Sequence, residues 1–214
     1  MLWIITATII SYLLGSIPTA YIFGRVLKGI DIRDFGSGNV GATNALRVLG
    51  KGPGVAVLLL DIFKGTAAVV LLGAFFKAKN MNIAPETLSI MLGIACVVGH
   101  SYTVFLNFRG GKGIATSLGV LIGLSINIPA LGAIVAMIIL SWLLIFAATR
   151  IISFASIIAA ILLPIYIAIF RQSSFLFFSS ILLSVFVILR HKQNISRLLK
   201  GQEKRISFKK KTLS

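Results

Sequence analysis

Long apolar stretches separated by short polar breaks recur along the 214-residue chain. Each stretch approaches the roughly 20 residues that a helix needs to cross about 30 Å of hydrocarbon. The strand-like alternation that a membrane β-barrel requires is not found. The pattern predicts one all-α domain, residues 1–214, folded as a polytopic transmembrane helical bundle. We place seven spans at about residues 2–24, 54–76, 87–106, 114–127, 129–148, 151–170 and 175–189.

The boundary between the fourth and fifth spans rests on little sequence. Only Asn127 and Pro129 suggest it, because proline disfavours helical geometry in the residue before it. The fourth span is also short. Models with six or five spans therefore remain open.

Lysine and arginine predict how the chain is oriented. With seven spans, one side of the membrane receives the basic loops at 25–51 and 109–112, Arg150 and the tail at 190–214. The other side receives Lys77, Lys79 and Arg171. By the positive-inside rule the first side is cytoplasmic, which places the N-terminus outside and the C-terminus inside. A five-span model leaves both termini on the same sides.

Composition narrows the class of protein. Hydrophobic residues make up 57% and charged residues 12%, too few charges to coat a soluble globule. The formal charge of +16 lies near span ends, which excludes nucleic acid and favours anionic lipid head groups and phosphorylated substrates. The run Lys209–Lys211 indicates a polybasic juxtamembrane tail. Cys96 stands alone and offers no metal cluster, so we expect neither a metal nor a cofactor.

The first basic loop contains Gly36-Ser37-Gly38-Asn39-Val40-Gly41, which matches G-x-G-x-x-G. A dinucleotide site is excluded because the loop lies between membrane spans and not in a βαβ unit. Glycines still let backbone N–H groups approach an anion, and a short helix at 42–49 would point its N-terminus at it. Further donors are Ser37, Asn39, Thr43, Asn44 and Arg47. The alternative is a flexible interhelical loop.

The second basic loop, residues 107–113, surrounds a lysine with glycines, as Gly110-Gly111-Lys112-Gly113. It lacks the first glycine and the hydroxyl of a nucleotide-binding P-loop, which argues against nucleotide hydrolysis. We interpret it as a phosphate or carboxylate clamp at the start of the fourth span. A plain positive-inside loop is the alternative.

Both histidines lie at or near span ends. On a continuing helix His191 and Asn194 would share one face with Leu198 and could face a common cleft. We favour a functional role for His191 and a structural role for His100.

Several polar residues fall inside the spans. Asp61 and Lys64 can pair at i,i+3, and a structural pair and a substrate role are equally compatible with that spacing. Ser153 and Ser156 could face the inner cleft or bond back to their own helix.

Three blocks together resemble the bacterial acyl-phosphate-dependent glycerol-3-phosphate acyltransferase family: SGNVGATNALRVLGKG, GHSYTVFLNFRGGKGIATS and RHKQNISRLLKGQE. The likeness includes GSIPTAY in the first span and D-x-x-K-G at Asp61. It implies a seven-span enzyme of the bacterial inner membrane with a cytoplasmic active site. Such an enzyme transfers a fatty acyl group from acyl phosphate to glycerol 3-phosphate, giving lysophosphatidic acid and phosphate.

The resemblance also implies site residues. Catalytic roles fall on Ser37, Lys112, His191 and Asn194, and substrate binding on Gly38, Asn39, Gly41, Thr43, Asn44, Arg47, Gly110, Gly111 and Gly113. We add Ser153 from its position beside the inner cleft. Thr103 departs from the proline expected there, which affects only local loop geometry. We expect acyl phosphate, glycerol 3-phosphate and membrane lipids as partners, and a monomer.

Acyl phosphate is an activated mixed anhydride, so direct transfer to the glycerol hydroxyl needs mainly orientation and charge stabilisation. We assign Ser37, Asn39 and Thr43 to acyl phosphate, and Arg47 and Lys112 to glycerol 3-phosphate. His191 and Asn194 would orient the nucleophile or the carbonyl, and His191 or a substrate phosphate would accept the proton. The rival functions are a small transporter for a phosphorylated solute, whose site would lie near the midplane, and a lipid-binding scaffold.

Overall fold

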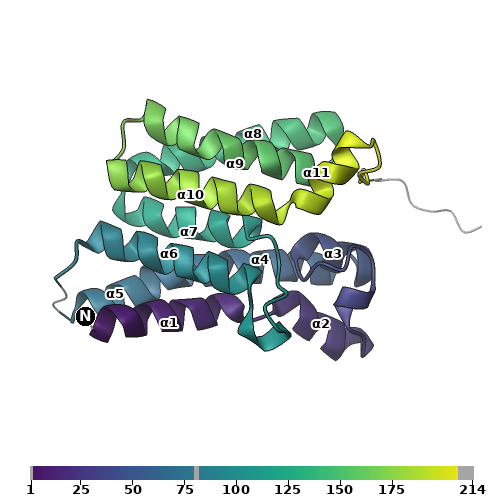
Figure 1. Ribbon diagram of the computed structural model, residues 1–214, viewed down its shortest axis with the longest axis horizontal. Coiled ribbons are helices and arrows are strands. Elements are labelled where there is room, and N and C mark those ends of the chain that lie inside the picture. Colours follow the sequence, from purple (N-terminus) through teal and green to yellow (C-terminus); the bar gives the residue numbers. More distant parts are fainter. Residues whose placement is uncertain (1, 80–81, 207–214) are drawn as a thin grey trace, which may run out of the picture.

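The computed structural model describes residues 2–79 and 82–206, and this part of the chain is a bundle of helices without a strand (Figure 1). The predicted run Lys209–Lys211 lies outside the described residues. In chain order the helices are α1 (Leu2–Ser16), α2 (Thr19–Lys28), α3 (Ala42–Val48), α4 (Lys51–Ala67), α5 (Gly73–Lys77), α6 (Pro85–Ser101), α7 (Ile114–Asn127), α8 (Ala130–Thr149), α9 (Ile152–Ile169), α10 (Ser174–Arg190) and α11 (Lys192–Leu199). A π-helical turn, η2 (Ala68–Leu72), joins α4 to α5, and 3-10 turns occur at η1 (Ile32–Asp34) and η3 (Val104–Leu106).

The all-helical membrane architecture is confirmed, while the number of spans stays a prediction. Within the described residues, five stretches are long and apolar enough to cross a bilayer: Leu2–Lys28, Lys51–Lys77, Pro85–Leu106, Ala130–Thr149 and Ile152–Ile169. The pair α10 and α11 would make a sixth, but the two helices meet at a bend of 62°. Helix α7 has 14 residues, about 21 Å at 1.5 Å per residue, which is short for a span.

Two helix boundaries test the proline argument. Helix α7 ends at Asn127 and α8 begins at Ala130 after Pro129, so the break expected between the fourth and fifth segments is present. The first segment, in contrast, was expected to be continuous over 2–24 and is broken between α1 and α2 at Ile17 and Pro18. Proline lacks the N–H that a continuous helix requires.

Helix α7 lies in the middle of the bundle, between α6 and α10 in Figure 1. It packs against α4 so closely that a Cβ on Gly119 would lie 1.9 Å from the Ile62 carbonyl oxygen. Helices α1 and α6 meet in the same way, where a Cβ on Gly15 would lie 2.0 Å from the Cys96 carbonyl oxygen. Small residues let helix backbones approach in a membrane, where packing replaces the hydrophobic effect.

The break between α1 and α2 is held by the buried pair Asp61 and Lys64 on α4. Their side chains lie 2.9 Å apart, and both are buried. Lys64 Nζ donates to the Ile17 carbonyl at 3.1 Å, and Thr19 Oγ1 donates to Asp61 Oδ1 at 2.7 Å. The sequence left open a structural ion pair or a substrate role for Asp61 and Lys64. In the structure the two residues form an ion pair, and this pair supports the break between α1 and α2.

Candidate functional site

A cavity of about 460 Å³ occupies the end of the bundle that carries α3 and α11. Its body is apolar and lies among α7, α8, α9 and α10, with Leu121, Ile138 and Leu163 on its wall. Its mouth is polar. Most of the predicted site residues line it together: Ser37, Asn39, Gly41, Thr43, Asn44, Arg47, Lys112, Gly113, Ser153, His191 and Asn194. Segments far apart in sequence thus converge on one space.

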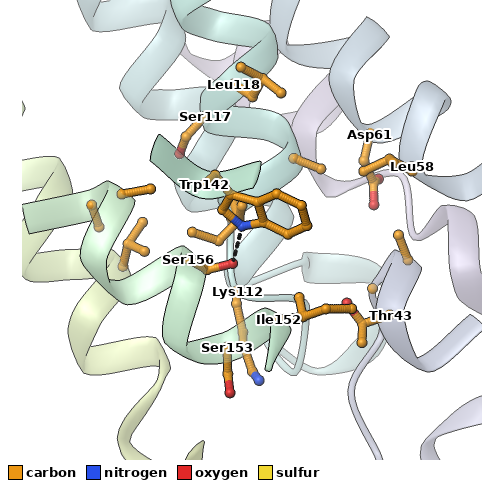
Figure 2. A pocket seen from close by; sticks show the side chains of 18 of the residues that line it. Thr43, Leu58, Asp61, Lys112, Ser117, Leu118, Trp142, Ile152, Ser153 and Ser156 are labelled. Atoms are coloured by element: carbon orange, nitrogen blue, oxygen red, sulfur yellow. Dashed lines mark hydrogen bonds between the residues drawn. The ribbon is translucent and has the colours of Figure 1, made fainter. Parts of the chain in front are cut away.

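Figure 2 shows how the polar and apolar parts meet. The indole of Trp142 lies across the middle of the cavity, and its Nε1 donates to Ser156 Oγ at 3.1 Å. Lys112, Ser153 and Thr43 lie on one side of this ring in the view, and Ser117 and Leu118 on the other. The cavity can therefore receive a molecule with a charged head and a long apolar tail.

The first glycine-rich loop is shaped by Asn44. Its Oδ1 accepts from the Ser37 backbone N–H at 2.8 Å, and its Nδ2 donates to the carbonyls of Ile32 and Phe35, both at 3.1 Å. Gly36, at φ +67°, passes so close that a Cβ would lie 2.3 Å from the same Oδ1. The side chain of Asn44 is thus engaged with the loop backbone, which presents Ser37 and Thr43 at the cavity.

The second glycine-rich loop uses its glycines differently from the phosphate or carboxylate clamp that the sequence predicts. The N–H of Gly110 donates to the Ser101 carbonyl at 3.1 Å, and that of Gly111 to the His100 carbonyl at 3.0 Å. Because these N–H groups already donate to carbonyls at the end of α6, they are not available to an anion. A Cβ on Gly110 would lie 2.1 Å from the His100 carbonyl oxygen, which explains the need for glycine. The loop contributes Lys112 to the cavity through its side chain.

Lys112 is held by a network that includes the tail. Its Nζ donates to Asn194 Oδ1, and Asn194 Nδ2 donates to Glu203 Oε1 at 2.6 Å. Burial lowers the pKa of Lys112 to about 8, and the charge of Glu203 partly opposes that fall. Lys112 is therefore largely charged at pH 7, as an anion site requires.

Glu203 is a lining residue that the sequence did not single out. Ser153 Oγ donates to its Oε1 at 2.8 Å, and Arg197 Nε donates to its Oε2 at 2.6 Å. Burial raises the pKa of Glu203, but hydrogen bonds from Arg197, Ser153 and Asn194 outweigh it and keep the pKa below its usual value. The available signal was its position as the one acidic residue in a basic tail.

The expectation of a continuing helix through His191 is wrong. The helix bends by 62° at His191, which ends α10 and precedes α11. His191 and Asn194 nevertheless both line the cavity, because Asn194 lies in the first turn of α11, directly after the bend. Nδ1 of His191 donates to the Val187 carbonyl at 2.8 Å, since a carbonyl only accepts, and this leaves Nε2 as an acceptor in the neutral ring. Burial lowers the pKa of His191 to about 4, so the ring is neutral at pH 7.

Three of the predicted residues do not line this cavity. Gly38 and Gly110 line a second pocket, and Gly111 lies against the His100 ring, where a Cβ would be 2.1 Å from Nε2. His100, expected to be structural, is buried with Nδ1 3.6 Å from Asp61 Oδ1, and both residues reach the cavity wall. Thr103 is buried and donates through Oγ1 to the Ser16 carbonyl at 2.5 Å, so it braces the end of α1.

Comparison with known proteins supplies the family. Residues 5–201 match the family model described as glycerol-3-phosphate acyltransferase. The chain belongs to this family. Curated relatives with that name include one from Chlorobium chlorochromatii, 40% identical and covering 98% of this chain and 100% of the relative. Another from Gloeobacter violaceus is 44% identical and covers 92% of this chain and 91% of the relative.

Two solved structures agree with the fold. Both are crystal structures of PlsY (YgiH), an integral membrane glycerol 3-phosphate acyltransferase. The glycerol 3-phosphate form has a TM-score of 0.83 at 38% identity, covering 95% of this chain and 96% of that one. The lysophosphatidic acid form has a TM-score of 0.81 at 37% identity, covering 95% of each. The protein is accordingly an integral membrane acyltransferase.

Proposed function

We propose that this protein transfers a fatty acyl group from acyl phosphate to glycerol 3-phosphate, giving lysophosphatidic acid and inorganic phosphate. One observation carries the proposal: a single cavity joins an apolar body between α7 and α10 to a mouth that holds Arg47 and Lys112. The acyl chain occupies the apolar body, and both phosphate groups lie at the cationic mouth. Such an arrangement brings a membrane-borne donor to a water-soluble acceptor.

The residues at the mouth divide between the two substrates. Arg47 and Lys112 bind the phosphate of glycerol 3-phosphate, because cationic donors make strong hydrogen bonds to phosphate oxygens. Ser37, Asn39 and Thr43 bind the acyl phosphate with neutral donors. Asn194 keeps Lys112 in place because its Oδ1 accepts a hydrogen bond from Nζ.

Transfer is direct, without an acyl-enzyme. The glycerol oxygen bonds to the acyl carbon, the bond from that carbon to the phosphate oxygen breaks, and phosphate leaves with the electron pair. An acyl-serine requires a nucleophile beside a base, and within residues 2–79 and 82–206 no hydrogen bond joins Ser37 or Ser153 to His191.

His191 orients the glycerol hydroxyl by accepting its proton in a hydrogen bond at Nε2. A ring with a pKa of about 4 is a weak base. A phosphate monoester, with a second pKa of about 6, is the stronger one. We therefore assign the leaving proton to a substrate phosphate.

The same proposal includes the setting of the enzyme. It is a multi-pass protein of the bacterial inner membrane with seven spans, an outer N-terminus and a cytoplasmic C-terminus, and its cavity opens to the cytoplasm. This orientation follows the basic residues of the loops and the tail. It acts as a monomer, because one chain supplies both ends of the cavity.

The test is a two-substrate assay. Purified protein in lipid nanodiscs is incubated with palmitoyl phosphate and glycerol 3-phosphate, and phosphate release and lysophosphatidic acid are followed together. The expected result is equimolar formation of both products only when both substrates are present. No product, or product from an acyl thioester but not from acyl phosphate, contradicts the proposal. Recovery of a radiolabelled acyl-protein that reacts on to product contradicts direct transfer.

A further inference from the structure

A second pocket of about 490 Å³ lies outside the proposed active site. Arginines come to it from three separate segments: Arg33 from the first loop, Arg109 from the second loop and Arg190 from the end of α10. Asp34 is the carboxylate in its wall. Three guanidinium groups against one carboxylate favour an anion, and the planar guanidinium matches the oxygens of a phosphate.

Two of these guanidinium groups are fixed in place. Arg33 Nη2 lies 2.6 Å from Asp31 Oδ2, and this hydrogen-bonded arginine lowers the pKa of Asp31 to about 2, so the pair persists at neutral pH. Arg190 donates from Nη2 to the Gly111 carbonyl at 3.1 Å and lies over the Tyr102 ring at 4.7 Å.

Each of these two residues also keeps donors free. In Arg33 and in Arg190, Nη1 makes no hydrogen bond to any part of the chain that the structure describes. Donors that are held in place but unused reduce the ordering that a ligand must impose on binding.

The surroundings of the pocket indicate a lipid. Phe108 lines it and is 58% exposed, and Phe105 in the preceding turn η3 is 59% exposed. Aromatic rings exposed at the polar end of a membrane bundle lie at the level of the lipid head groups. We propose that this pocket binds the phosphate of an anionic phospholipid from the surrounding bilayer, with an acyl chain against the exposed phenylalanines.

The pocket shares its segments with the main cavity. Gly38 in its wall stands between Ser37 and Asn39, Gly110 precedes Lys112 by two residues, and Arg190 adjoins His191. A phosphate bound here joins three of the segments that supply the polar mouth. Activity therefore rises with the anionic lipid content of the membrane, which goes beyond the proposed reaction.

The first test measures lipid binding without turnover, and a second compares turnover rates. Wild type, Arg109→Gln and Arg205→Gln are purified in mixed micelles of phosphatidylglycerol and phosphatidylcholine, and retained lipid is identified by native mass spectrometry. The Arg109 side chain makes no hydrogen bond or ion pair with the described residues, and Arg205, an arginine of the tail that is also exposed, serves as the matched control. Equal melting temperatures of the three proteins exclude a folding effect.

The wild type is expected to retain phosphatidylglycerol in preference to phosphatidylcholine. Arg109→Gln retains about fivefold less, as expected for one basic contact at a membrane surface, and Arg205→Gln matches the wild type. Equal losses in both variants reduce the effect to general surface charge and overturn the proposal. So does displacement of the lipid by equimolar inorganic phosphate, which would make this a free-phosphate site. In phosphatidylcholine alone, Arg109→Gln and wild type turn over equally.

Discussion

The two glycine-rich loops look alike in sequence and differ in structure. In the first loop Asn44 organises the backbone, and short side chains such as Ser37 and Thr43 reach the cavity. In the second loop the N–H groups of Gly110 and Gly111 are bonded to the end of α6, and Lys112 alone carries the charge into the site. Glycine thus allows a turn in the first loop and close packing against α6 in the second.

This difference predicts which substitutions remove a contact to substrate and which disturb the conformation of a loop. A residue that contacts substrate changes the rate or the Michaelis constant and leaves the melting temperature unchanged. A residue that frames a loop changes both. The two loops can be separated by measuring both quantities on each variant.

The largest effect is expected at Lys112. Lys112→Met keeps the volume but removes the charge, and the rate should fall about 1,000-fold, the range for losing one donor that stabilises developing charge. The rate of lysophosphatidic acid formation checks this. Lys51→Met, an exposed lysine on the same end of the bundle, is the control and should be unchanged. A Lys112→Met enzyme with wild-type kinetics would mean that the second loop supplies no substrate contact.

Gly110→Ala tests the packing role of the second loop. The added Cβ would meet the His100 carbonyl oxygen at 2.1 Å, so the loop must shift and Lys112 with it. A displacement of about 1 Å costs about 100-fold in rate, and the melting temperature should fall by several degrees. Gly52→Ala, where a Cβ meets nothing within 4 Å, is the control. Lost activity at an unchanged melting temperature would instead indicate direct substrate contact.

Asn44→Ala tests the frame of the first loop. It removes the hydrogen bonds to Ser37, Ile32 and Phe35, so the Ser37 N–H loses its partner while the two carbonyls keep only the N–H groups of Phe35 and Gly38. The rate should fall ten- to thirty-fold and the melting temperature should drop. Asn39→Ala, which also lines the cavity, should raise a Michaelis constant without changing the melting temperature. Identical kinetics and melting temperatures of the two variants would mean that Asn44 and Asn39 do not differ in role.

The pH profile reports the protonation of Lys112. Its pKa is lowered to about 8, so the charged form is lost as the pH rises through that value. The rate at subsaturating glycerol 3-phosphate should fall about tenfold between pH 7 and pH 9. Lys112→Arg stays charged and should lack this decline. A decline of the same size in Lys112→Arg would assign it to another group.

The smallest effect is expected at Glu203. Glu203→Gln removes the negative charge that raises the pKa of Lys112, so the alkaline decline should move to lower pH and the rate at pH 7 should fall about threefold. Glu86→Gln is the control, because Glu86 accepts from Ser173 at the opposite end of α6. An unchanged pH profile in Glu203→Gln would mean that Glu203 of the tail does not affect the active site.

Most helix positions could be predicted because membrane spans leave a strong signal in apolar length. The predicted 114–127 coincides with α7, and Pro129 marked the start of α8. The break at Pro18 was missed, since proline also occurs within continuous membrane helices. The bend at His191 was missed because no proline or glycine marks it.

The sequence by itself determined the apolar segments, the basic loops and the residue types at the polar mouth, because length, charge and donor chemistry are properties of single residues and their neighbours in the chain. Only the tertiary structure decided which of these groups remain available to contact a substrate. Hydrogen bonds to distant segments use the N–H groups of Gly110 and Gly111 and the side chain of Asn44, and they bring Glu203 beside Asn194. The arrangement of α7 to α10 likewise turns scattered apolar residues into one cavity, because the packing of helices depends on every contact at once.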